Sequence, residues 1–367
     1  MSRLRAFLLT ISMVLSSPVP GWTAELREMA GQMIVVGFQG DSADVPWPRA
    51  LAAMIARGEI GGVMYLRANV ASLSAVSAMN RQFLEAQPVP GLPPLIALDQ
   101  EGGQIERLTA AVGFDEIPSA QKVAGSLSPE AAEELYFRMA SGVAAVGFNL
   151  NFGPVVDLNA NPDNPIIARY ERAFAAEPAV VVAYAAAFVR GHHRAGVLTA
   201  LKHYPGHGSS TGDSHDGFVD ISDTWTRAEL EPYAALIRQG FADMVMTGHL
   251  FVRDFAESDA DLPASLSARA VQQGLRGDLG FAGVVISDDM EMGAVRQNFG
   301  RREAVVRAVM AGTDILLFSN TAEPSLALPG EILDILVSEA TSDPAFRARI
   351  EQSYARVVAL KSRLPGP

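Results

Sequence analysis

Residues 197–217 read VLTALKHYPGHGSSTGDSHDG. The stretch begins with a short apolar run, and Lys202 and His203 follow directly at the end of that run. A run without polar alternation is typical of a parallel strand that is covered on both faces. The glycines, the proline and the short polar residues that come next do not suit the interior of a helix or strand, so they predict a loop. The stretch therefore predicts a buried strand with a polar loop at its carboxyl end.

The same apolar pattern recurs along the chain and sets the fold class. Seven more short runs lie at residues 32–38, 61–66, 94–99, 148–158, 243–249, 283–289 and 313–319. Eight strands that alternate with helices predict an α/β fold, a single (β/α)8 TIM-type barrel, with irregularity allowed in its first strands. An open doubly wound sheet is the alternative, but no glycine-rich nucleotide fingerprint follows the first run.

Helix signals occupy the segments between these runs. Ser128 and Pro129 have the residue types of a helix cap and a first helical position. Thr226 and Glu229 have the spacing of a capping box, for a helix that ends at Gly240. Residues 344–364 predict a last helix that packs along the barrel.

The composition excludes several classes of function. The chain has 367 residues, a formal net charge of −12 and no cysteine. The acidic balance argues against binding to nucleic acid, whose phosphates attract basic surfaces. A sequence without cysteine has no disulfides and no thiolate metal ligands.

The first residues have the layout of a secretory signal peptide. A basic start, MSRLR, precedes the apolar run AFLLTISMVLSS, which is too short to span a bilayer. We therefore expect a signal peptide over residues 1–23, one domain over residues 24–367, and a periplasmic or secreted protein. If the run is instead an N-terminal helix of the folded protein, a cytoplasmic location follows. No later segment is long and apolar enough for a transmembrane helix, and the single domain predicts a monomer.

Polar residues gather at one end of the predicted strands. They follow the apolar runs directly, and they are Asp99, Asp157, Lys202, His203, His249 and Asp288. In a (β/α)8 barrel the carboxyl ends of the strands and their loops form the catalytic face. The pattern therefore predicts a site that several strands build together.

The loop after residue 203 contains a candidate proton donor. Asp213 and His215 are two residues apart, so an extended backbone points both side chains to the same side. A carboxylate bonded to one ring nitrogen orients the imidazole and favours its protonated form. Glycines around the pair suit a mobile segment. A zinc site is the alternative for this loop, because His203 and His207 have H-x3-H spacing. The proline and glycine between them prevent the helix that would bring both rings to one face. We therefore interpret His207 as the residue that holds a sharp turn.

Two other segments supply acidic groups. Asp288 ends an apolar run, and a carboxylate at a barrel mouth near a cation can act as a nucleophile. We interpret the neighbouring Asp289 as a cap of the following helix. Asp99, Glu101 and Arg107 surround a Gly-Gly turn and suit a ligand rich in hydroxyl groups, although Glu101 and Arg107 suit a structural ion pair equally well.

Together these segments resemble the NagZ-type β-N-acetylglucosaminidases of glycoside hydrolase family 3. The resemblance rests on DQEGGQIERL, NFGPVVDLN, LKHYPGHGSSTGDSH, MTGHL and VVISDDMEMGA, in that order along the chain. It covers nearly all of residues 24–367 and implies that this domain is a (β/α)8 catalytic domain.

The resemblance implies a role for each matching residue. Asp288 would be the nucleophile, His215 the general acid and then the general base, and Asp213 the partner that orients His215. The residues that would bind the terminal N-acetylglucosamine are Asp99, Arg107, Arg172, Lys202 and His203. Arg169 is the competing candidate for the position of Arg172. No cofactor and no metal are implied.

The resemblance implies a retaining, exo-acting β-N-acetylhexosaminidase that forms a covalent glycosyl-enzyme. Its carbohydrate substrates would be muropeptides derived from peptidoglycan or chitooligosaccharides. A glycoside phosphorylase would use the same residues with phosphate in place of water. A periplasmic sugar-binding protein without turnover is a further alternative, but it has no need of a nucleophile and a proton donor.

Overall fold

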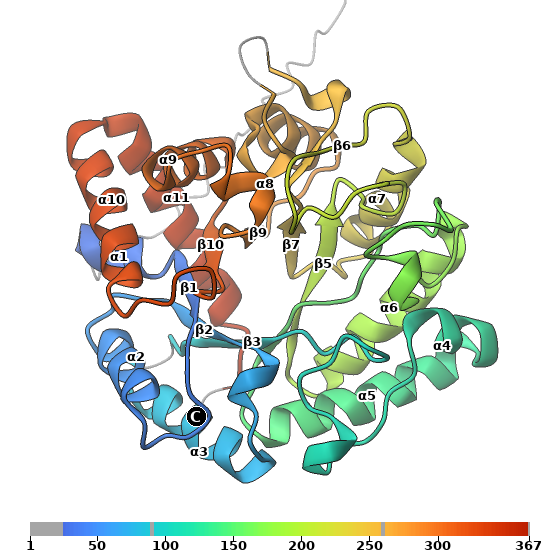
Figure 1. Ribbon diagram of the computed structural model, residues 1–367, viewed down its shortest axis with the longest axis horizontal. Helices are drawn as coiled ribbons and strands as arrows, with labels where there is room; N and C mark the ends of the chain where they lie inside the picture. The colour runs from blue at the N-terminus through green and yellow to red at the C-terminus, as the bar shows by residue number, and fades with distance from the viewer. Residues whose placement is uncertain (1–24, 89–91, 258–260, 366–367) are drawn as a thin grey trace, which may run out of the picture.

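Parallel strands from the whole length of the chain close into one barrel (Figure 1). The computed structural model describes residues 25–88, 92–257 and 261–365, so the signal peptide predicted over residues 1–23 lies outside the described residues. Within this described part, the barrel strands are β1 (Ile34–Gly37), β2 (Gly62–Tyr65), β3 (Leu95–Leu98), β4 (Leu150–Asn151), β5 (Leu198–Tyr204), β7 (Met244–Thr247), β9 (Val284–Asp289) and β10 (Ile315–Phe318). Their order is β1-β10-β9-β7-β5-β4-β3-β2, with all neighbours parallel. Each predicted apolar run matches one of these strands, although β5 continues past its run to Tyr204, and the (β/α)8 barrel is confirmed.

The regularity of the pairing differs around the barrel. β1 pairs with β2, and β2 with β3, in continuous register. The register shifts between β9 and β10 and between β5 and β7. The irregularity that the sequence allowed for the first strands therefore occurs instead at the strands that carry Asp288, Lys202 and His203.

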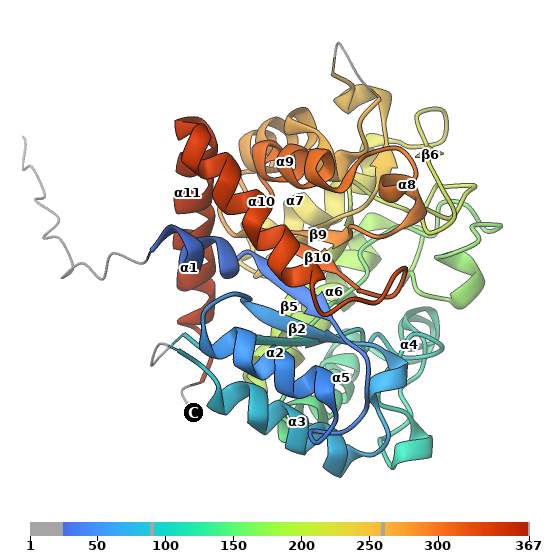
Figure 2. The same ribbon diagram turned by 60° about the vertical axis from the view of Figure 1, so that its left-hand side comes forward.

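Helices surround the barrel on all sides (Figures 1 and 2). They are α1 (Leu26–Gly31), α2 (Pro46–Ala56), α3 (Leu73–Glu85), α4 (Ala120–Ser126), α5 (Pro129–Ala145), α6 (Pro178–Arg194), α7 (Glu231–Arg238), α8 (Gly293–Arg296), α9 (Arg301–Ala311), α10 (Leu328–Ser342), α11 (Pro344–Lys361) and the π-helical η7 (Arg269–Asp278). Short 3₁₀ turns are η1 (Arg67–Asn69), η2 (Ala110–Val112), η3 (Ala168–Tyr170), η4 (Arg227–Leu230), η5 (Arg253–Phe255) and η6 (Ala264–Leu266). Two short strands outside the barrel, β6 (Val219–Asp220) and β8 (Leu250–Phe251), pair with each other.

The two predicted helix starts have different outcomes. The Ser128 hydroxyl accepts a hydrogen bond from the amide of Ala131, and α5 begins at Pro129, as predicted. The capping box of Thr226 and Glu229 is wrong. Thr226 makes no side-chain cap, and the Glu229 carboxylate instead accepts a hydrogen bond from the amide of Gly208, 3.1 Å away in the loop after β5. Glu229 therefore makes a tertiary hydrogen bond in place of the local one that a capping box requires.

The last helix closes the amino-terminal end of the barrel. α11 packs Val357 and Leu360 into the cluster that contains the first residues of β3, β5, β7, β9 and β10. The buried Lys361 ammonium donates to Gln32 Oε1 at 2.6 Å and to the carbonyl of Gly61 at 2.7 Å. The predicted packing of this helix along the barrel is confirmed, and the carboxyl end of the barrel stays free for a site.

Within the described residues, none of the helices combines the length and the apolar character that crossing a bilayer requires.

Candidate active site

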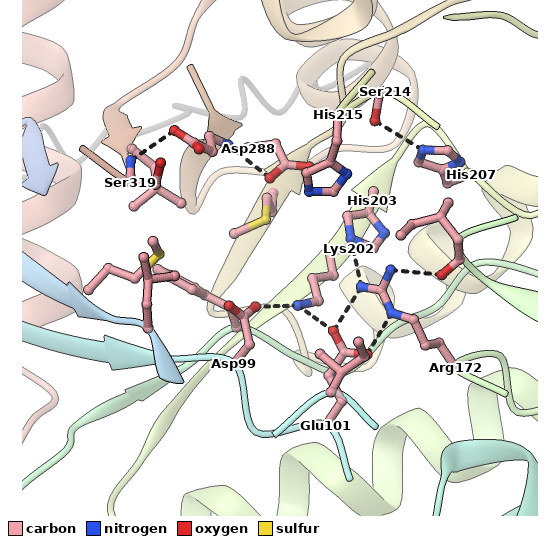
Figure 3. Close-up of a pocket in the computed structure, with 18 of the residues that line it drawn as sticks. Asp99, Glu101, Arg172, Lys202, His203, His207, Ser214, His215, Asp288 and Ser319 are labelled. Carbon is pink, nitrogen blue, oxygen red and sulfur yellow. Dashed lines mark hydrogen bonds and ion pairs between the residues drawn. The ribbon is translucent and has the colours of Figure 1, made fainter. Parts of the chain in front are cut away.

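A pocket opens at the carboxyl ends of the barrel strands and contains most of the predicted site residues (Figure 3). Its volume is about 230 Å³. This is below the roughly 300–1,000 Å³ of pockets that hold drug-sized ligands, so the cavity suits a small group such as one sugar ring. The predicted residues that line it are Asp99, Arg107, Arg172, Lys202, His203, His215 and Asp288. Asp213 lies behind His215 and contacts it.

Alternating charges form one wall of the pocket. We call this wall the ion-pair cluster; its members are Asp99, Glu101, Arg107, Arg172 and Lys202. The Lys202 ammonium lies 2.6 Å from Asp99 and 2.7 Å from Glu101. Arg107 donates to the second oxygen of Asp99 at 2.8 Å, and Arg172 donates to both oxygens of Glu101 at 2.8 Å. The cluster holds its polar groups rigidly at the pocket surface.

The charges of the cluster decide the protonation of its acids. Burial alone would raise the pKa of Asp99, but the charges of Lys202 and Arg107 outweigh burial and lower it well below its usual range. Burial opposes Arg172 and Lys202 at Glu101 in the same way, and the pKa of Glu101 falls to about 2. Both carboxylates are therefore ionised at neutral pH and can accept hydrogen bonds from hydroxyl groups.

The two candidate arginines differ in their positions relative to the pocket. Arg172 is buried in the pocket wall, where it contacts Glu101, the carbonyl of Ile166 and the His203 ring. Arg169 lies outside the pocket lining, with its guanidinium 5.5 Å from the centre of the Tyr170 ring. Arg172 is therefore the arginine that can reach a ligand.

Glu101 is a site residue that the sequence left ambiguous. It lines the pocket and also forms the ion pair that the sequence offered as the alternative. Its position two residues after Asp99 indicated that Glu101 could belong to the site. Its ion-pair partners Arg172 and Lys202 lie far away along the chain, so the sequence did not reveal them.

A buried aspartate, Asp157, contacts one histidine near the end of β5 and another in the loop that follows it. One oxygen of Asp157 accepts hydrogen bonds from the backbone amides of His203 and His207, at 3.1 and 2.8 Å. Its second oxygen lies 2.7 Å from Nδ1 of His203. The His203 ring is thereby fixed at the pocket surface.

His207 holds the turn, as predicted. Its Nδ1 lies 2.7 Å from the hydroxyl of Ser210 and its Nε2 lies 3.2 Å from the hydroxyl of Ser214. Burial lowers the pKa of His207 to about 4, so the ring is neutral. Asn164 supports the same turn, because its amide donates to the carbonyls of His207 and Gly208. No local sequence signal pointed to Asn164.

The two neighbouring aspartates at the end of β9 differ in environment. Burial would raise the pKa of Asp288, but the imidazole groups of His203, His249 and His215 outweigh burial and lower it. Burial raises the pKa of Asp289, whose carboxylate is bonded to backbone amides of Glu291 and Ser319. Asp288 is thus the ionised carboxylate that faces the pocket.

Asp289 does not cap the following helix, and that interpretation is wrong. One carboxylate oxygen of Asp289 accepts hydrogen bonds from the amides of Glu291 at 3.1 Å and Ser319 at 2.8 Å. The residue before α8 is Met292. Asp289 therefore joins the end of β9 to the end of β10.

His249 lies under this turn and outside the pocket lining. Its ring contacts the hydroxyl of Ser265 at 2.7 Å and the carbonyl of Asp289 at 2.9 Å. The sequence placed His249 at a strand end with the other candidate residues. In the structure it supports the pocket wall behind Asp288.

The Asp213–His215 pair lies on residues 211–217, which we call the donor segment. Nδ1 and the backbone amide of His215 lie 2.7 and 2.9 Å from the same oxygen of Asp213. Burial would raise the pKa of Asp213, but the amide and ring of His215 lower it. The His215 side chain is 60% exposed, and Figure 3 shows its ring beside the Asp288 carboxylate, across the pocket from Asp99 and Glu101. The arrangement places a carboxylate and an exposed imidazole that is bonded to a second carboxylate on one small cavity.

Comparisons with known proteins agree with this geometry. The model of the glycosyl hydrolase family 3 N-terminal domain matches residues 25–360. Beta-hexosaminidase LpqI of Mycobacterium tuberculosis is 34% identical over 349 residues, which cover 93% of this chain and 84% of the relative. A beta-hexosaminidase of Xylella fastidiosa is 39% identical over 298 residues, 78% of this chain and 82% of the relative.

Solved structures of the same family share the fold. A glycoside hydrolase family 3 beta-N-acetylglucosaminidase from a Paenibacillus species superposes with a TM-score of 0.82 at 32% identity over 93% of this chain, which spans 62% of that longer chain. A beta-N-acetylhexosaminidase from Beutenbergia cavernae gives a TM-score of 0.80 at 31% identity, with 92% of this chain and 98% of that one covered.

Proposed function

This chain belongs to glycoside hydrolase family 3, and from that membership we propose that it is an exo-acting, retaining β-N-acetylhexosaminidase. The observation that carries the proposal is the placement of an ionised Asp288 and the His215–Asp213 pair on one cavity of about 230 Å³. Relatives that are named beta-hexosaminidases and beta-N-acetylglucosaminidases support the choice of an N-acetylhexosamine as the terminal sugar.

Asp288 supplies the nucleophile of the reaction. Its carboxylate attacks the anomeric carbon of the terminal sugar while the glycosidic bond breaks, and a covalent glycosyl-enzyme forms. His215 protonates the leaving oxygen in this step and then takes a proton from the attacking water in the second step. Two inversions at the same carbon restore the β configuration, so the product retains the configuration of the substrate.

The ion-pair cluster binds the sugar. Asp99 accepts hydrogen bonds from sugar hydroxyls, while Arg107, Arg172 and Lys202 donate to sugar oxygens. The small volume of the cavity favours one terminal ring over an internal segment of a polysaccharide, which supports exo-action. His203 lies beside Arg172 and shares this surface.

We propose fragments of peptidoglycan or of chitin as the substrates. The decisive experiment incubates purified protein with a wall-derived disaccharide and with chitobiose, and follows the anomers by NMR. The expected first product is β-N-acetylglucosamine. An α-anomeric first product would refute the retaining mechanism, and a sugar phosphate formed only in phosphate buffer would identify a phosphorylase.

We also propose that the protein acts outside the cytoplasm. The basic start and the short apolar run of residues 1–23 support this location. N-terminal sequencing of the protein recovered from its host should find that the apolar run has been removed. A mature protein that starts at Met1 would refute the location.

A further inference from the structure

The donor segment is bound in its middle by α8. The carbonyls of Ser214, His215 and Asp216 follow one another along the chain, and each accepts a hydrogen bond from this helix. Ala294 donates to Ser214 at 3.1 Å and Gly293 donates to His215 at 3.0 Å, both through the backbone amide. The side-chain amide of an α8 neighbour, Gln297, donates to Asp216 at 3.1 Å.

Other contacts fix the two ends of the segment. At its beginning, the buried Ser210 is bonded to His207 and Asn164. At its end, Val219 pairs with Leu250 in the small sheet of β6 and β8. In the middle, the Ser214 hydroxyl contacts His207, and the backbone carbonyls of Ser214 and His215 are held by α8.

Gly293 sets how closely the donor segment can approach α8. A Cβ atom on Gly293 would lie 2.6 Å from the carbonyl oxygen of His215, 2.8 Å from the carbonyl carbon of Asp216 and 2.8 Å from the amide nitrogen of Gln297. Two of these atoms belong to the backbone of the donor segment, so a side chain here must displace the segment.

The contact also links the two reacting groups. Gly293 follows Asp288 by five residues, through the turn that ends β9. The helix α8, which follows β9 and its Asp288, therefore also holds the segment that carries His215. A displacement of the donor segment from α8 moves His215 relative to Asp288.

We propose that the first turn of α8 is a latch that holds the His215–Asp213 pair at the pocket, with Gly293 and Gln297 as positioning residues. The proposal rests on the glycosidase function proposed above. His215 acts in both steps of that reaction, so the latch must be closed when the leaving group departs and when water attacks. Opening of the latch allows the donor segment to leave the pocket mouth during product release.

Kinetics of Gly293→Ala test the latch. Chitobiose has a poor leaving group and needs protonation, whereas 4-nitrophenyl N-acetyl-β-glucosaminide has a good one. General acid catalysis contributes about 10²–10⁴-fold, and a displaced donor loses part of it, so we expect kcat/KM for chitobiose to fall by about tenfold to a hundredfold. We expect kcat/KM for the nitrophenyl substrate to change by less than about threefold. Azide needs no general base, so it should raise kcat of the variant on the nitrophenyl substrate.

Gly300→Ala is the matched control. A Cβ atom at Gly300 meets no described atom within 4 Å, and the residue lies outside the latch, so both kcat/KM values should stay at the wild-type level. If Gly293→Ala keeps the wild-type ratio of the two kcat/KM values, or lowers both equally, the latch is refuted.

Hydrogen exchange tests the latch without turnover. Gln297→Ala removes one of the three hydrogen bonds, at an exposed position that the fold tolerates. We expect faster amide exchange in residues 211–217 of this variant and of Gly293→Ala than in the wild type or Gly300→Ala. Unchanged exchange in both latch variants would refute the latch. Wild-type protein that turns over neither substrate would instead refute the proposed function.

Discussion

Glu101→Gln tests the electrostatic basis of the pocket. The Glu101 carboxylate has one ion pair with Lys202 at 2.7 Å and a two-point contact with Arg172 at 2.8 Å. Glutamine has nearly the same shape, but it brings no charge and turns an NH2 group toward one of two cations. All three side chains are less than 10% exposed, so water does not replace the lost charge.

Two independent considerations give the size of the effect. Removing one partner of a buried ion pair costs about 3–5 kcal/mol. The pKa of Glu101 falls from 4.5 to about 2 on folding, which corresponds to roughly 3 kcal/mol of linked stability. With an unfolding entropy of roughly 0.7 kcal/mol/K for a chain of this length, the melting temperature of the variant should fall by about 4 °C at pH 7.

The pH dependence distinguishes a lost charge from a packing defect. A lowered carboxyl pKa stabilises the fold above its unfolded value of 4.5, and this stability is lost as the pH falls toward 2. The glutamine variant has no such titration, so the difference in melting temperature should shrink by roughly half at pH 3. Calorimetry at pH 7 and pH 3 measures both values.

Glu85→Gln is the control for this experiment, because Glu85 is exposed at the end of α3. A surface change of this kind shifts stability by less than about 0.5 kcal/mol. The reasoning fails if Glu101→Gln melts within about 1 °C of the wild type, or if its deficit is the same at both pH values.

Three further predictions concern single substitutions. Asp288→Asn should lower kcat by about a thousandfold or more, while Asp289→Asn, which alters a turn, should keep more activity; the reverse order in steady-state assays would contradict the assignment. His215→Ala should lower kcat/KM far more for chitobiose than for the nitrophenyl substrate, by a factor within about 10²–10⁴, and equal losses would mean that His215 only positions the substrate. Burial raises the pKa of Glu229 to about 7, so its stabilising contribution is full below pH 4.5 and is lost as the pH rises through 7. The melting temperature of Glu229→Gln should therefore depend less on pH between 5 and 8 than that of the wild type, and parallel curves would refute this.

The strands were predictable because their signal is local. A strand covered on both faces needs an apolar run, and the barrel strands lie within predicted runs except β5, which continues past its run to Tyr204. The same logic placed Asp99, Lys202 and Asp288 at one face, since parallel strands end at the same edge. The fold class and the strand-end part of the pocket follow from these two rules, although Asp157 and His249, also placed at strand ends, lie outside the pocket lining.

The predictions that failed share a physical cause. A capping box and a helix cap both assume that a carboxylate bonds to the nearest free amide. Glu229 bonds instead to Gly208, and Asp289 bonds to Ser319 as well as to the nearby amide of Glu291. Gly208 and Ser319 come from other parts of the chain. A sequence pattern does not show such competing donors, because the closure of the barrel brings them close. The partner of Arg172 was hidden for the same reason.

The charge of Asp288 explains why an imidazole suits the donor position better than a second carboxyl group. Two carboxyl groups in one small pocket repel each other when both are ionised, so one of them holds its proton more tightly. A protonated His215 has the opposite sign and lowers the pKa of Asp288, which keeps the nucleophile ionised. Once Asp288 is esterified to the sugar its negative charge is gone, and its attraction for the imidazolium goes with it. His215 has by then given its proton to the leaving oxygen, so a neutral imidazole faces an uncharged ester and can take a proton from the attacking water in the second step.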